Sequence, residues 1–220
     1  MNAPRDRIKS RVLAPLPEEQ PDAGLLRAGA AALLLALFGL GAAAWLSLTQ
    51  DGGADAVAQI AGLAPSVVSV AVPDVLRLAL ALDFAVLLGY GAGFCLLGAA
   101  LSYSRARAAL AFGIATFTLL GVTFDLVENA MALTGAAAEV YSVVKFGTVG
   151  VAAFLLASAF PPNGWGNLVR VVGWVATPLA LIAVLAGLPL AQDPLIFALT
   201  LGLAFAIVAL AAMMTARAIR

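Results

Sequence analysis

Residues 116–135 read TFTLLGVTFDLVENAMALTG, an apolar run that carries two carboxylates and one amide. A run of about 20 mainly apolar residues is long enough, as a helix, to cross the roughly 30 Å hydrocarbon core of a bilayer. Carboxylates are costly in hydrocarbon, so Asp125, Glu128 and Asn129 are candidate functional residues. The stretch therefore predicts a membrane-spanning helix with a polar site inside it.

The composition of the whole chain agrees with this interpretation. Apolar residues make up 63% of the 220 and charged residues 11%, and the mean hydropathy is +1.05. A soluble domain has roughly 45–50% apolar and about 25% charged residues. The formal net charge is zero, so no nucleic-acid partner is indicated. The sequence predicts an integral membrane protein whose first partner is the lipid bilayer.

The apolar stretches predict an all-α fold, a compact bundle of six transmembrane helices. The expected spans lie near 25–48, 75–102, 108–134, 138–160, 168–190 and 194–216. Residues 1–24 are predicted to be a mobile cytoplasmic tail, residues 25–216 the bundle, and residues 217–220 a basic cytoplasmic end. In the loop between the first two spans, residues 55–64 (DAVAQIAGLA) could form a short surface helix, and Pro178 should kink the fifth span.

The basic residues predict the orientation of the bundle. Ten of them flank the spans on the side of the two termini: Arg5, Arg7, Lys9, Arg11, Arg27, Arg105, Arg107, Arg170, Arg217 and Arg220. The opposite side carries mainly acidic residues, and the basic residue found there is Arg77. Because cytoplasmic loops are rich in Lys and Arg, both termini should be cytoplasmic. The chain is expected to be a multi-pass protein of the plasma (inner) membrane.

Ionisable residues of three spans fall at a similar depth. At 1.5 Å per residue, Asp83 should lie about 12 Å below the outer surface, Asp125 about 13 Å and Lys145 about 10 Å. Asp125, Glu128 and Asn129 share one helix face, because they stand at positions i, i+3 and i+4. Lipid cannot satisfy such groups, so they should face one another inside the bundle, in the outer half of the membrane.

Lys145 is the expected partner of these acids, and Tyr90 and Tyr141 are further candidates on the same spans. The seven residues form the set of candidate ligand- or proton-binding residues: Asp83, Tyr90, Asp125, Glu128, Asn129, Tyr141 and Lys145. Three acids against one lysine leave two excess negative charges if all ionise. A shared proton, Arg77, a bound cation or a cationic ligand could offset them. The alternative is structural: the same residues could only fix the packing of the helices.

Several classes of site are excluded or disfavoured. The chain has no histidine and a single cysteine, Cys95, so His-ligated metals, multi-cysteine metal sites and His-dependent catalytic triads are absent. No phosphate-binding loop or serine-hydrolase elbow occurs. We expect no metal and no cofactor. Whether the protein is an enzyme stays open at this stage.

Three functions remain. The first is a non-catalytic membrane partner or complex subunit with a buried acid–lysine cluster. The second is a small proton- or cation-coupled transporter that uses the cluster, and the third is a membrane enzyme acting on a lipid or isoprenoid. Gly89 and Gly93 form a GxxxG pattern, which allows close helix approach either inside the bundle or in a homodimer or partner interface.

Overall fold

The structure is a computed structural model that describes residues 20–61, 63, 73–134, 139–186 and 193–219. Its helices are α2 (Ala23–Thr49), α3 (Gly53–Ile60), α4 (Pro73–Ala100), α5 (Arg105–Thr134), α6 (Glu139–Ala159), α7 (Gly164–Val171), the π-helix η1 (Val172–Ala176), α8 (Thr177–Leu185) and α10 (Pro194–Ala218). Six helical segments are long and apolar enough to span a membrane, with α7, η1 and α8 together forming the fifth. The prediction of an all-α, six-helix membrane bundle is confirmed.

Capping residues set where several helices begin. Asp22 accepts a hydrogen bond from the backbone N–H of Leu25 at 2.9 Å, so α2 begins at Ala23, inside the segment predicted as a tail. Asn163 caps α7 in the same way, so the fifth span begins at Gly164 rather than near residue 168. Of the predicted tail, residues 1–19 lie outside the described part of the chain.

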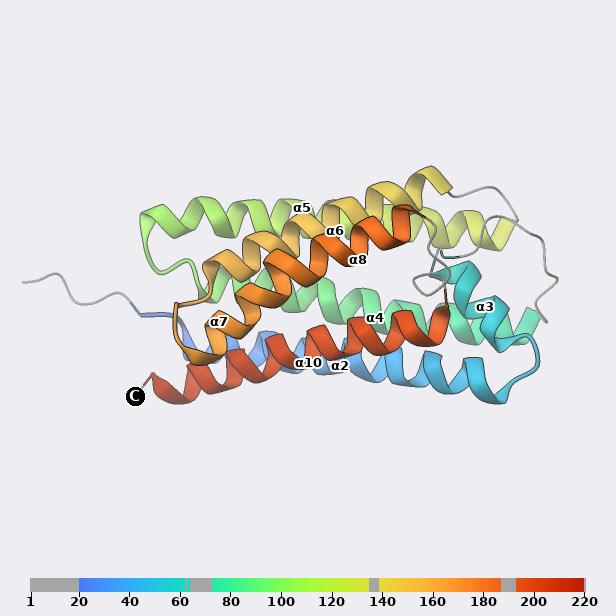
Figure 1. The fold of residues 1–220 in the computed structure, drawn as a ribbon, viewed down its shortest axis with the longest axis horizontal. Helices are drawn as coiled ribbons and strands as arrows, with labels where there is room; N and C mark the ends of the chain where they lie inside the picture. The colour runs from blue at the N-terminus through green and yellow to red at the C-terminus, as the bar shows by residue number, and fades with distance from the viewer. Residues whose placement is uncertain (1–19, 62, 64–72, 135–138, 187–192, 220) are drawn as a thin grey trace, which may run out of the picture.

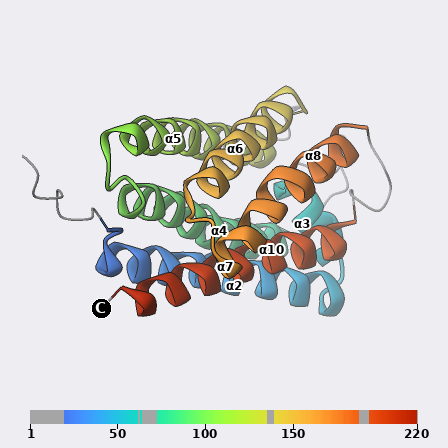
Figure 2. The same ribbon diagram turned by 60° about the vertical axis from the view of Figure 1, so that its left-hand side comes forward.

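The helices form two layers that run roughly along the same axis. Figures 1 and 2 show α2, α4 and α10 in one layer and α5, α6 and the α7–α8 segment in the other. Helix α2 packs between α4 and α10, and α5 packs against α6 and α4. The start of α2 and the end of α10 lie at one end of the bundle, and α3 is tucked between the layers at the other (Figure 1).

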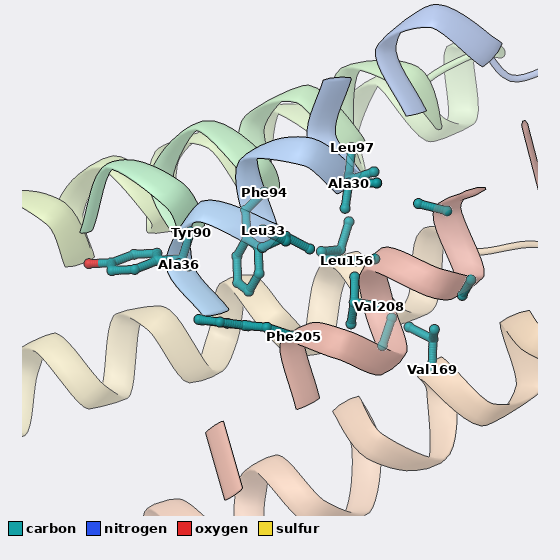
Figure 3. Packing of buried hydrophobic residues seen from close by; sticks show 14 of the residues in the cluster. Ala30, Leu33, Ala36, Tyr90, Phe94, Leu97, Leu156, Val169, Phe205 and Val208 are labelled. Carbon is teal, nitrogen blue, oxygen red and sulfur yellow. The ribbon is translucent and has the colours of Figure 1, made fainter. Parts of the chain in front are cut away.

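Apolar side chains fill the space between the layers. In Figure 3, Phe94 of α4 and Phe205 of α10 face each other, and their ring centroids are 6.1 Å apart in an edge-to-face arrangement. The ring of Tyr90 extends this row, 6.2 Å from Phe94, with its hydroxyl pointing away from the apolar cluster. The aromatic row thus leads from the apolar core to the polar residues described below.

The GxxxG glycines are used inside the bundle. A Cβ added at Gly89 would collide with the backbone of α2 at Ala32 and Ala36, and one at Gly93 would meet Leu33. Both glycines are buried. Helix α2 therefore packs on the face formed by these glycines, which is the intrabundle alternative that the GxxxG pattern predicts.

The fifth span contains a π-helical turn immediately before Pro178. The backbone N–H of Thr177 bonds to the carbonyl of Val172, five residues earlier, and the Thr177 hydroxyl donates to the same oxygen at 3.2 Å. Proline lacks an N–H, so the helix cannot keep its regular ladder there. The disturbance expected at Pro178 thus takes the form of a π-turn, on the side that packs against α6.

Candidate functional site

Lys145 lies at the centre of a buried polar network. Its ammonium is 3.1 Å from Asp125 Oδ1 and also forms an ion pair with Glu128 Oε2. Only 5% of Lys145, 5% of Asp125 and none of Glu128 is exposed. One lysine of α6 therefore bridges two carboxylates of α5, and the helix face predicted from their spacing is the face turned toward α6.

Each of these carboxylates also accepts a hydrogen bond from a hydroxyl. The Tyr90 hydroxyl, from α4, donates to Asp125 Oδ2 at 3.1 Å. The Ser142 hydroxyl, from α6, donates to Glu128 Oε1. Hydrogen bonds to a charged acceptor are stronger than those between neutral groups, so both hydroxyls strengthen the contacts that join α5 to α4 and α6.

Asp83 and Asn129 form a second part of the network. The side-chain amide of Asn129 donates to Asp83 Oδ2 at 2.7 Å, which ties α5 to α4. Asn129 is 2% exposed, whereas Asp83 is only partly buried. The Asn129 carbonyl oxygen is buried and has no hydrogen-bond partner. Asp83 is therefore bound to an amide, not to the lysine that the sequence suggested as the common partner.

The short helix α3 covers the network at the end of the bundle away from the termini. The carbonyl of Ala61, just after α3, accepts a hydrogen bond from the Lys145 ammonium at 3.3 Å. The Gln59 amide donates to the carbonyl of Ala132 at 3.2 Å, which fastens α3 to the end of α5. Ala56, Val57 and Ile60 are buried in this position. The helix expected on the surface is in fact packed between the two layers.

The structure brings together six of the seven predicted residues. The seventh, Tyr141, is half-buried, and its ring packs against Phe124 with 6.4 Å between centroids. Arg77, considered as a counter-ion, forms an exposed pair with Asp74 at 3.5 Å. We use the name acid–lysine cluster for the residues of this network: Asp83, Tyr90, Asp125, Glu128, Asn129, Ser142 and Lys145.

Two contributors were missed from the sequence. Ser142 precedes Lys145 by three residues, so helical spacing places both on one face of α6, and this signal was available. The carbonyl of Ala61 carries no such signal, because any residue has one and its position depends on how the loop folds back. The two groups that the sequence analysis missed are thus the hydroxyl of Ser142, which donates to Glu128, and the backbone carbonyl of Ala61, which accepts from Lys145.

The charge of the cluster is unbalanced. In the described part of the chain, the cluster holds three carboxyls and one ammonium. Across the same residues, no group of three or more acidic or cysteine side chains is placed to hold a metal ion. The cluster therefore holds two more carboxyls than it has ammonium groups to pair with them.

Comparison with known proteins gives no relative: no family model, curated protein or solved structure matches this chain. Six apolar helices make it a polytopic membrane protein. Any more specific function has to be argued from the cluster and the surface of the bundle.

Proposed function

We propose that the protein is a non-catalytic partner or subunit of a membrane complex, in which the acid–lysine cluster holds the helices in register. One observation carries this proposal: the charged groups of Lys145, Asp125 and Glu128 are occupied by one another. Lys145 already has three acceptors, and Asp125 and Glu128 each have an ammonium and a hydroxyl. A substrate would have to displace these contacts and separate packed helices to reach them.

The partner is expected to bind the most exposed spans. In the most apolar stretch of the fifth span only 17% of the residues are buried, and in that of α5 the share is 22%. In the other four spans the same share is 33–39%. In the fifth span, α8 exposes Leu179 and Ile182, each at 61%. A helix surface that contributes little to its own bundle is the surface most available for another membrane protein.

The proposal includes an orientation. The end of the bundle at which α2 begins and α10 ends holds Arg27, Arg107, Arg170 and Arg217. Asp51, Asp74 and Asp193 belong to the other end. The excess of positive charge at the first end supports cytoplasmic termini in the plasma membrane.

Co-purification combined with site-specific photo-crosslinking tests this function. The full chain, tagged and extracted in a mild detergent, should carry a second protein at a fixed ratio in quantitative mass spectrometry. A photo-reactive residue at Leu179 should crosslink to that same protein. Leu199 of α10 is the matched control, because it is also leucine and is also 61% exposed. Equal crosslinking at both sites, or lipid adducts alone, would count against the proposal.

A proton- or cation-coupled transporter is the second candidate, favoured by the excess of carboxyls in the cluster. Transport requires the site to open, and α3 is the element that covers it. Proteoliposomes should then show a proton or cation flux that Asp125→Asn abolishes and Asp74→Asn, at an exposed acid, leaves unchanged. Flux that is equally low in all three proteins would eliminate this candidate. The lipid-modifying enzyme has less support, because the ammonium expected to orient its substrate is engaged.

A further inference from the structure

Only one of the two polar atoms of the Asn129 side chain has a hydrogen-bond partner. Its nitrogen donates to Asp83 Oδ2 at 2.7 Å, while its carbonyl oxygen is buried without a donor. Buried hydrogen-bond acceptors almost always have a donor. An acceptor that is buried without a donor loses its hydrogen bonds to water and gains none within the protein. The unpartnered oxygen belongs to the same amide whose nitrogen donates to Asp83, so the second oxygen of Asp83 is the candidate for the missing donor.

The three carboxyls of the cluster differ in the donors they receive. Asp125 and Glu128 each receive the Lys145 ammonium and a hydroxyl. Within the described residues, the hydrogen bond found for Asp83 comes from a neutral amide. A carboxylate in a membrane protein is stabilised by cations and by several donors. Asp83 is thus the carboxyl at which a negative charge is least compensated.

We propose that Asp83 and Asn129 form a proton-binding site, in which Asp83 is a neutral carboxylic acid. A hydronium ion transfers its proton to Asp83 Oδ1: one O–H bond of the hydronium breaks, the O–H bond at Oδ1 forms, and a water molecule is released. This O–H donates to the carbonyl oxygen of Asn129, while the Asn129 nitrogen donates to Asp83 Oδ2. The two side chains then form a closed acid–amide pair, and the buried oxygen of Asn129 gains its donor.

The surroundings of the pair explain why one proton belongs here. The groups that face Asp83 and its neighbours are Tyr90 on α4, Asp125 and Glu128 on α5, Ser142 and Lys145 on α6, and the Ala61 carbonyl after α3. With all carboxyls ionised the cluster has a net charge of −2, and a neutral Asp83 reduces it to −1. Asp83 is also the least buried of the three acids. Its side chain is therefore not enclosed between α5 and α6, as the side chains of Asp125 and Glu128 are.

Infrared spectroscopy of the full chain in lipid nanodiscs tests this site directly. At neutral pH the wild type should show the carbonyl-stretch band of a protonated carboxylic acid. Labelling with [4-¹³C]aspartate should shift that band, which assigns it to aspartate and not to glutamate. The band should be missing in Asp83→Asn and present in Asp125→Asn. In Asn129→Leu it should persist at a higher frequency, because the acid loses its amide partner.

Every outcome decides the proposal. A band that survives Asp83→Asn, or a wild type with no such band, overturns it. Asp83→Asn should also keep the wild-type melting temperature, because a neutral amide can replace a neutral acid as donor and acceptor. If Asp83→Asn fails to fold, the labelled wild type and Asn129→Leu decide: the absence of an aspartic-acid band, or a band whose frequency is the same in Asn129→Leu, overturns the proposal. The inference does not depend on a protein partner, so failed co-purification leaves it intact.

Discussion

Replacing Lys145 by methionine should strongly destabilise the bundle. Methionine retains most of the apolar stem but removes the ammonium that pairs with Asp125 and Glu128. Removing one partner of a buried ion pair costs about 3–5 kcal/mol, because the remaining charge is left uncompensated. Here two carboxylates of α5 lose their cation and the carbonyl of Ala61 loses its donor. We therefore expect a loss near the upper end, about 4–5 kcal/mol.

A matched control is available in the same chain. Arg77→Met also removes one cation from one ion pair, but Arg77 and Asp74 have 76% and 88% of their side chains exposed. Exposed pairs contribute at most about 1 kcal/mol, so this variant should unfold almost like the wild type. The comparison separates the effect of burial from the general effect of losing a positive charge.

A compensating variant tests the cause of the loss. Combining Lys145→Met with Asp125→Asn and Glu128→Gln removes the charges together while keeping acceptors for Tyr90 and Ser142. Replacing a whole buried ion network by neutral groups is often nearly neutral, so much of the lost stability should return. The free energy of unfolding can be measured by reversible denaturation in mixed micelles followed by circular dichroism. A Lys145→Met variant as stable as Arg77→Met would refute the reasoning.

Three further substitutions, the first with a matched control, test other parts of the structure by the same unfolding assay. Gly89→Ala should cost about 1–3 kcal/mol through overpacking against α2. Gly41→Ala is its control, because a Cβ at Gly41 would have open space around it, and this variant should be neutral or slightly stabilising. Equal effects of the two substitutions would contradict the close packing of α4 on α2. Ser142→Ala should cost about 1–3 kcal/mol, because Glu128 loses a donor, and no loss would speak against that hydrogen bond. Thr177→Val should cost about 1 kcal/mol at the π-turn, and a more stable variant would be the opposite result.

Most of the fold could be predicted from hydropathy, because the length of an apolar run and the thickness of a bilayer are both physical constraints. Each predicted span overlaps one of the six membrane-spanning segments of the structure. The fifth span begins at Gly164, a few residues before its predicted start near residue 168, since the Asn163 cap extends that helix into a polar segment. The π-turn could not be foreseen, because Pro178 predicts a disturbed ladder but not the form that it takes.

The meeting of Asp125, Glu128 and Lys145 could be predicted because depth along a helix follows from residue number. The pairing inside the cluster could not. Asp83 was expected to share the lysine, yet it bonds to Asn129. Which acid faces which donor depends on the rotation of each helix about its axis, and small residues such as Gly89 set this through packing.

The position of α3 shows the limit of the sequence-based argument. An amphipathic segment between two spans fits either a surface helix or one that packs into the bundle. Only the fold shows that Gln59 reaches α5 and that the carbonyl of Ala61 reaches Lys145. A backbone carbonyl has no signature in the sequence, so the cover of the cluster could not be inferred beforehand.

The central claim is that charges from two different helices meet directly inside the membrane. Solid-state NMR in lipid bilayers can measure the dipolar coupling between ¹⁵N at Lys145 Nζ and the ¹³C carboxyl of Asp125. The Lys145 nitrogen and the nearest oxygen of the Asp125 carboxylate are 3.1 Å apart, so a dipolar coupling between the two labels is expected in the wild type. The coupling should be absent from the Asp125→Asn variant prepared with the same aspartate label. A wild-type spectrum without this coupling would show that α5 and α6 do not present their charges to each other, and the account of the cluster would fail.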